Sequence, residues 1–459
     1  MVKDLTVGKP SSVLWRFSIP MFVSVIFQQM YNIADSVVAG KFAGEAALAA
    51  VGASYPITMI FMAVAVGSNI GCAVVISQLF GAKRWKEMKT AIYTTLIACI
   101  ALSLSLMALG FLFCRPVMNL IQTPADIFSD GALYLRIYIG GFLFLYLYNV
   151  CTGIFTSLGD SRTPLYFLIG SSLGNILLDM IFVIVFHWGV AGVAWATFIA
   201  QGAACVLALL TVHKRIAEVK TEGSFPLFSW NMLKKISVVA VPSILQQSFI
   251  SVGNMFIQGL VNSFGSSVIA GYSAAVKLNT FTITSFTTLA NGLSSFTAQN
   301  IGAGQEERVK SGFKAGWFMA FCVAVPFTIL FFFFGGPAVT IFMEQTGGEA
   351  MNTGVTFLKI VSPFYVVVAT KLMADGVLRG SGAMGCFMVA TFADLILRVL
   401  ISFVLAGPFG ADGIWMSWPI GWTIATALSL SFYLRGKWKL SRDLRSEEHT
   451  SELQSPRTI

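Results

Sequence analysis

The two halves of this chain repeat one residue pattern, and this duplication limits the fold more than any other feature. QLFGA at residues 78–82 returns as QNIGA at residues 299–303. Self-similarity over half a chain indicates one architecture built twice, and in a strongly apolar protein it is typical of transporters. We expect functional differences between the halves where the repeat breaks down. The other positions that match at nearly the same offset are Pro20, Asn32 and Phe42 with Pro242, Asn254 and Phe264; Leu158-Gly159 with Arg379-Gly380; and Gly189, Gly192 and Trp195 with Gly410, Gly413 and, one position off, Trp415.

The composition places both halves in a membrane. Hydrophobic residues make up 56% of the chain and charged residues 11%, whereas soluble domains carry about 25% charged residues. Apolar stretches of about 20 residues, the length that crosses a bilayer, occur about twelve times, about six in each half. We therefore predict an all-α membrane protein with two six-helix lobes. A pseudo-twofold axis along the membrane normal relates the lobes, because each half begins and ends on the same side. The predicted spans are residues 13–40, 51–79, 91–113, 132–156, 165–187, 190–212, 236–262, 267–298, 314–335, 353–377, 387–407 and 412–434.

The net charge of +9 does not indicate a nucleic-acid partner, because the basic residues are spread over short loops rather than gathered in one patch. These loops lie on one side if every span crosses, and the positive-inside rule makes that side cytoplasmic. We expect a monomeric, multi-pass protein of the cell (inner or plasma) membrane, in contact with lipid and with both termini in the cytoplasm. The basic loop residues are Lys83, Arg84, Lys86 and Lys89; Lys214, Arg215, Lys220, Lys234 and Lys235; and Arg308, Lys310 and Lys314.

The predicted lobes cover residues 1–222, which include the start of a cytoplasmic linker, and residues 223–440. Residues 441–459 form a polar tail that contains RSEEHTSELQS. This string matches, codon for codon, the translation of a common sequencing-library adapter. We therefore interpret the tail as largely an assembly artefact and exclude it from functional reasoning, as tags are excluded. The alternative is a genuine disordered tail.

Carboxylates inside a span are functional candidates, because even lenient insertion scales assign them a cost of about 2.5 to 3.5 kcal/mol. Asp35 lies near the outer end of the first span, and Asp179 lies in the fifth. Asn175 is one turn before Asp179 on the same helix face, and Thr197 lies about two turns into the sixth span. At a rise of about 1.5 Å per residue these four polar groups fall at a similar depth, so we expect one shared site. Gln28, two turns before Asp35, either shares this network or only packs.

These four groups suit either of two coupling ions. Two carboxylates, an amide oxygen and a hydroxyl are the oxygen ligands that a hard cation such as Na⁺ prefers, so Asp35, Asn175, Asp179 and Thr197 are the expected metal ligands if Na⁺ binds. The same groups suit a proton, because burial and a neighbouring like charge both favour a protonated carboxyl. The alternative for the amide and the hydroxyl is a structural hydrogen bond between helices. We expect no cofactor beyond the coupling ion.

The second half carries charges of a different kind inside its spans. Lys371 and Asp375 are one turn apart, as are Asp394 and Arg398, so each couple is spaced to form an ion pair. Lys277 has no obvious local partner. These five residues are either structural charges or side chains on a cavity wall with a substrate or gating role.

Several motifs that would mark an enzyme are missing. The chain has no GxxxxGK[ST] for nucleotide hydrolysis, no HExxH or GxSxG, and no Asp-rich prenyl-phosphate motif. We therefore expect no catalytic residues and no enzymatic activity. Active transport by this chain would draw its energy from an ion gradient.

Four segments together resemble the multidrug and toxic compound extrusion (MATE) family. They are DSVVAGKFAGEAALAAVGASYPI at residues 35–57, QLFGAKR at 78–84, GNILLDMIFV…WGVAGVAWAT at 174–197 and GVLRGSG at 376–382. Each occupies the expected span in order, and the resemblance covers the chain from Trp15 to Trp438.

The resemblance implies an antiporter that exports cationic or amphipathic compounds in exchange for Na⁺ or H⁺, with two lobes that rock around a central cavity. Its ion site uses an Asp in the first helix, an Asn and an Asp in the fifth and a Thr in the sixth; these positions match Asp35, Asn175, Asp179 and Thr197 here. Some relatives add a carboxylate pair in the C-terminal lobe. Here Ile257 stands opposite Asp35 and Arg398 opposite Asp179, so no second ion site is expected.

Two alternatives stay open from the sequence. A lipid-linked oligosaccharide flippase, of a related two-lobed class, would need a strongly basic cavity to hold pyrophosphate. Lys277, Lys371 and Arg398 fit that alternative, whereas Asp35 and Asp179 argue against it. A passive channel or receptor is the other alternative, and the duplicated lobes and the buried acids argue against it.

Overall fold

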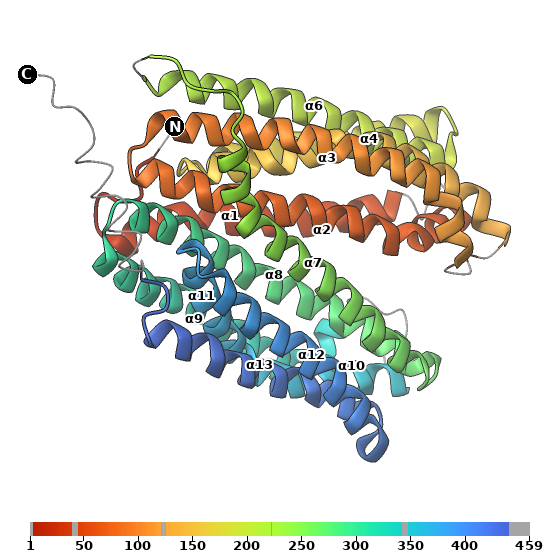
Figure 1. The fold of residues 1–459 in the computed structure, drawn as a ribbon. Coiled ribbons are helices and arrows are strands. Elements are labelled where there is room, and N and C mark those ends of the chain that lie inside the picture. The colour runs from red at the N-terminus through yellow and green to blue at the C-terminus, as the bar shows by residue number, and fades with distance from the viewer. Residues whose placement is uncertain are drawn as a thin grey trace, which may run out of the picture.

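The computed structural model of the chain describes residues 3–38, 45–120, 123, 125–221, 223–341 and 348–439, of which residues 34–38, 45–50 and 53 are described by their backbone alone. This part of the chain is helical and contains no strand. Its helices form two bundles that lie side by side (Figure 1). The first bundle contains α1 (Pro10–Val38), α2 (Glu45–Gly81), α3 (Trp85–Leu120), α4 (Ala125–Ser157), α5 (Arg162–Asp179) with the π-helix η2 (Met180–Val185), and α6 (Gly189–Glu218). The second contains α7 (Trp230–Asn262), α8 (Ser266–Gly302), α9 (Glu306–Thr340), α10 (Gly348–Val361), η3 (Ser362–Phe364), α11 (Tyr365–Gly380), α12 (Met384–Phe409) and α13 (Ala411–Leu434).

Each bundle is organised around central helices. In the first, α4 packs against both α2 and α6, and in the second α8 packs against α9, α10 and α11 while α12 pairs with α13. The bundles meet where α2 contacts α7 and α8, and where α1 contacts α8 and α9. Figure 1 shows α7 running obliquely across α2 towards α12. The all-α architecture with two lobes, expected from the duplication, is therefore confirmed.

The helices form because a bilayer offers the backbone no water, so every N–H and C=O must bond within its own segment. Ten helical stretches of the described chain are long and apolar enough to cross a membrane, by length and composition. α8 and α13 fall below the hydropathy of these ten, although with 37 and 24 residues they are long enough to cross. α8 is rich in Ser, Thr and Asn and lies between the lobes.

Two predicted spans are not uniform α-helices. The span at 353–377 is divided by η3, where Pro363 lacks the N–H that would continue the hydrogen bonds of α10. The span at 165–187 changes from α-helix to π-helix after Asp179. A third irregularity lies in α9, where Phe334 leaves helical geometry with φ −119° and ψ 27°, three residues before Pro337.

The lobes touch most closely where the repeated motif ends α2 and α8. A Cβ atom placed on Gly81 would lie 1.9 Å from the Gln299 carbonyl oxygen, and one placed on Gly302 would lie 2.0 Å from the Gln78 carbonyl oxygen. The side chains of the same glutamines bind the opposite lobe as well: Gln78 Nε2 donates to Gly380 O at 3.0 Å, and Gln299 Nε2 donates to Ser157 O at 2.7 Å. Glycine is therefore required twice, so that two backbones can approach across the pseudo-twofold axis. We call this contact the closed end.

The segments that precede the first helix of each lobe bind to the other lobe. Before α1, Leu5 N donates to Gln299 Oε1 at 2.9 Å, and Arg308 of α9 donates to Leu5 O at 3.2 Å and to Gly8 O at 2.6 Å. Before α7, Thr90 Oγ1 of α3 donates to Pro226 O at 2.8 Å. The two lobes are thus braced in both directions at the closed end.

The reciprocal glycine contact predicts that a single methyl group loosens the closed end. Gly81→Ala should lower the free energy of unfolding by about 1 to 3 kcal/mol, because its Cβ has no room against the Gln299 carbonyl. Gly170→Ala in α5 is the matched control, since nothing lies within 4 Å of its Cβ position. The control should be neutral or slightly stabilising, because alanine favours a helix by roughly 1 kcal/mol over glycine. Thermal unfolding of the purified variants measures both, and equal midpoints would contradict the prediction.

Candidate functional site

Three helices of the first lobe bring polar side chains together beside Asp179. Asn175 Nδ2 donates a hydrogen bond to Asp179 Oδ2 at 2.9 Å, one turn along α5. The hydroxyl of Tyr31, on α1, donates to Asn175 Oδ1. On α6, Thr197 Oγ1 lies 3.5 Å from the same amide oxygen and makes its shorter bond, 3.1 Å, to Val193 O. Asn175 and Asp179 are 2% and 1% exposed, so this Asp179 cluster is closed off from solvent.

The structure brings three of the five predicted ion-site residues into the Asp179 cluster. The side chain of Asp35 lies outside the described residues, although its backbone belongs to α1. Gln28 donates to Asn32 Oδ1 at 3.2 Å and lines a cavity between the lobes. Among the contacts described for this part of the chain, Gln28 therefore faces the cavity and not Asp179.

The sequence reasoning missed Tyr31. Tyr31 carries no charge and is not one of the positions that match between the two halves. It nevertheless lies one turn before Asp35 on the same face of α1. That spacing was the available signal, because a tyrosine hydroxyl buried in lipid needs a partner. Through Tyr31 the Asp179 cluster is connected to α1, the helix that also packs against α8 of the other lobe.

The helix geometry changes directly after Asp179. Residues 180–185 form η2, in which Phe186 N donates to Ile181 O at 3.0 Å, five residues back. π-Helical turns are rare and occur frequently at functional sites, because they interrupt the regular α-helical bonding. Asp179 therefore lies at a junction of two helical geometries rather than inside a continuous α-helix.

The chemistry of the Asp179 cluster is that of one buried acid with neutral oxygen-bearing neighbours. A carboxylate, an amide oxygen and two hydroxyls are oxygen donors of the kind that hard cations prefer, and a buried carboxylate can also be neutralised by a proton. Within the described residues no three His, Cys, Asp or Glu side chains gather closely enough to hold a metal ion. A Na⁺ ligand set drawn from them would combine the carboxylate with neutral oxygens.

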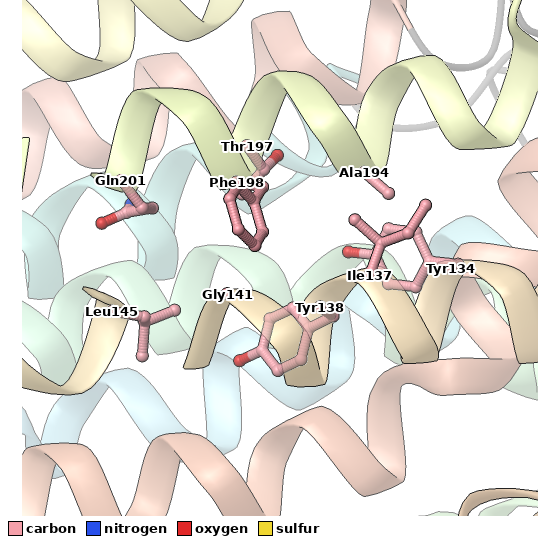
Figure 2. A pocket seen from close by; sticks show the side chains of 9 residues that line it. All are labelled: Tyr134, Ile137, Tyr138, Gly141, Leu145, Ala194, Thr197, Phe198 and Gln201. Carbon is pink, nitrogen blue, oxygen red and sulfur yellow. The ribbon is translucent and has the colours of Figure 1, made fainter. Parts of the chain in front are cut away.

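A cavity of about 20 Å³ lies on the other side of Thr197, between α4 and α6. Figure 2 shows Phe198 and Gln201 facing Tyr138 and Leu145 across it, while the Thr197 hydroxyl points away from α4. The space is large enough for about one water molecule. The Thr197 hydroxyl is thus turned towards the Asp179 cluster and not into this cavity.

The second lobe holds a buried network of opposite charges on α11, α12 and α13. Lys371 Nζ lies 2.8 Å from Asp375 Oδ2 and 3.9 Å from Asp394 Oδ2. Ser429 Oγ donates to Asp375 Oδ1 at 2.5 Å. The expected pair of Lys371 with Asp375 therefore forms. Lys277 lies apart on α8 and is exposed.

The expected pair of Asp394 with Arg398 does not form within the described chain. The Arg398 guanidinium stacks over the Trp418 ring instead, 4.5 Å from its centroid, and Asp394 is closer to Lys371. One-turn spacing permits an ion pair but does not require it. Neighbours from α11 and α13 supply the competing partners, a second cation for Asp394 and an aromatic face for Arg398.

Two adjacent cavities lie between the lobes. The wider one, about 280 Å³, is lined by α1, α4, α5 and α8 and includes Gln28, Tyr148 and Thr288. The deeper one, about 150 Å³, includes Asn69 of α2 and Arg379 of α11. They share Met21, Thr152 and Thr156 and are therefore adjacent, and we call them together the inter-lobe cavity.

Comparisons with known proteins show one family across both lobes. The family model described as MatE matches residues 20–181 and 242–404, one segment in each lobe. The "Probable multidrug resistance protein YpnP" of Bacillus subtilis (strain 168) is 27% identical over 437 residues, which cover 95% of this chain and 97% of that protein.

Solved structures share the fold at lower identity. A MOP superfamily transporter from Pyrococcus furiosus superposes with a TM-score of 0.88 at 21% identity, covering 95% of this chain and 98% of that one. An outward-facing multidrug resistance MATE family transporter superposes with a TM-score of 0.87 at 23% identity, covering 95% and 97%. These likenesses establish the two-lobed, twelve-span fold.

The charge network of the second lobe makes a stability prediction. Lys371→Met should destabilise the protein by about 3 to 5 kcal/mol, because it leaves buried carboxylates without their cation. Adding Asp375→Asn to that variant should recover part of the loss, since one of the stranded charges is then removed. Lys359→Met, an exposed change on the same span, is the matched control and should have little effect. Thermal unfolding of these four proteins and of the Asp375→Asn single variant tests this, and strictly additive losses would contradict it.

Proposed function

The chain belongs to the MatE family, and on that premise we propose that it is a secondary active antiporter that exports cationic or amphipathic small molecules in exchange for Na⁺ or H⁺. The observation that carries the proposal is the Asp179 cluster. A carboxylate buried at membrane depth is costly, and here it is 1% exposed. A carboxylate is expected at this depth when its charge is neutralised and restored during a transport cycle.

The coupling route in this proposal is α1. Its Tyr31 hydroxyl bonds into the Asp179 cluster, while Gln28, about one turn earlier, and Met21, about three turns earlier, line the inter-lobe cavity. α1 also packs against α8 and α9 of the second lobe. An ion that binds Asp179 changes the partners of Tyr31, so it changes the position of a helix that forms the cavity wall. A ligand drives such a change only by its difference in affinity for the two states.

The substrate in this proposal occupies the inter-lobe cavity. Its wall combines amide and hydroxyl groups with Met21 and Tyr148, an arrangement that suits amphipathic molecules of varied shape. The family relative described as a probable multidrug resistance protein supports drug export as the activity class.

The orientation in this proposal follows the basic loops. The closed end lies beside Lys83 and Arg84 on one lobe and the Arg308 segment on the other. The positive-inside rule assigns that end to the cytoplasm. The structure then corresponds to the state in which the cytoplasmic side is shut and export has delivered substrate outward.

Neutralising the acids should abolish coupling without loss of the protein from the membrane. Asp179→Asn and Asp35→Asn should each eliminate ion-driven dye efflux, because neither amide can take up and release a cation in the same way. Asp126→Asn is the matched control, an exposed acid in the first turn of α4, and should retain efflux. Everted vesicles with equal amounts of each variant measure the rates. Undiminished efflux in both the Asp179→Asn and the Asp35→Asn variant would end the proposal.

Separate gradients should identify the coupling ion. In vesicles that carry either a Na⁺ gradient or a pH gradient, one of the two should drive dye movement, and dissipating it should stop that movement. Asp179→Asn should lose the same response. Dye flux that ignores both gradients would favour the passive channel over an antiporter.

A further inference from the structure

One buried charge faces the deep part of the inter-lobe cavity. Arg379 is in the last turn of α11 and is 5% exposed. Among the described residues that line the two adjacent cavities, it is the only charged one. A buried cation in a membrane protein is costly unless a partner offsets it.

Within the described chain no carboxylate forms a salt bridge with Arg379. Its terminal nitrogen donates to Asn291 Oδ1 at 2.5 Å, and its guanidinium lies 5.7 Å from the centroid of Phe387. Asp375, one turn earlier, is engaged by Lys371 at 2.8 Å and by Ser429 at 2.5 Å. Arg379 Nε has no hydrogen-bond partner, and neither has the Ser294 hydroxyl, which lines the same deep cavity. Two buried donors at the deep cavity therefore have no hydrogen-bond acceptor within the described residues.

The position of the first lobe that matches Arg379 carries no charge. Arg379 corresponds to Leu158 in the first lobe, a buried side chain that is 1% exposed. The glycine that follows is kept in both copies, as Gly159 and Gly380. The first lobe therefore has an apolar residue at this position, and only the second lobe has an arginine there.

We propose that Arg379, with Asn291 and Ser294, forms an anion subsite at the floor of the inter-lobe cavity, which takes the carboxylate of an amphipathic, zwitterionic substrate. The guanidinium presents planar donors that match a carboxylate. The deep cavity of about 150 Å³ holds such a group, and the wider space above it, about 280 Å³ and lined in part by Tyr148, holds an aromatic body. This inference rests on the proposed export function and narrows its substrate class.

A pair of dyes that differ in one group tests the subsite. The probes are a rhodamine with a free benzoate carboxylate and the methyl ester of the same dye, and their binding to the full-length protein in nanodiscs is measured by fluorescence polarisation. Arg379→Gln should weaken binding of the acid by at least about tenfold, because a charge-assisted hydrogen bond is lost, and leave the ester within about twofold. Arg379→Lys should keep most of the preference for the acid. Lys235→Gln, an exposed change at the start of α7, is the control for overall charge and should alter neither dye.

The remaining outcomes are decisive as well. If Arg379→Gln weakens the binding of both dyes equally, Arg379 only connects α11 to α8 and does not recognise the carboxylate. If the binding of the acid dye is unchanged, Arg379 is not part of the binding site. In the wild-type protein, benzoate should displace the acid dye, whereas chloride at the same concentration should not; equal displacement by chloride would make this an inorganic-anion site and overturn the assignment.

Ester efflux in vesicles tests the proposed export separately. If the ester is exported while the acid shows no dependence on Arg379, the subsite alone fails; if the wild-type protein neither binds nor exports either dye, both proposals fail.

Discussion

The hydrocarbon interior of a membrane contains no water, and this constraint governs where every polar side chain of the protein lies. The two lobes meet it in opposite ways. In the first, the neutral amide of Asn175 donates a hydrogen bond to Asp179. In the second, Asp375 already lies against the Lys371 ammonium. The duplicated frame thus places an amide beside the acid of the first lobe and a lysine beside the acid of the second.

The two lobes also contribute different side chains to the wall of the inter-lobe cavity. α1 presents one face to the Asp179 cluster, through Tyr31, and another to the cavity, through Gln28. Across the cavity, the second lobe contributes Arg379 where the first has Leu158. α1 thus contacts the Asp179 cluster, the inter-lobe cavity and the second lobe.

Features that depend on the length and repetition of apolar segments could be predicted from the sequence. Features that depend on contacts with neighbouring helices could not. The two-lobed architecture followed from the apolar runs and the QLFGA repeat, and Asn175 and Asp179 were paired correctly because one-turn spacing is a property of the helix itself. The same rule was wrong for Asp394 and Arg398, since Trp418 from α13 competes for the arginine. The π-helix after Asp179 and the docking of Leu5 on Gln299 have no periodic signature, because both arise from tertiary contacts.

The closed end has a mechanical consequence. At about 1.5 Å per residue, α2 extends roughly 55 Å from Gly81 to its other end, so a contact between Gly81 and Gln299 acts as the fulcrum of a long lever. A rotation of only about 10° at this point would move the far end of the helix by about 10 Å, and the local contacts would shift by a small fraction of that distance. The two glycines that allow the backbones to touch therefore lie at one end of a helix that is long enough to turn a small rotation there into a large displacement at its other end.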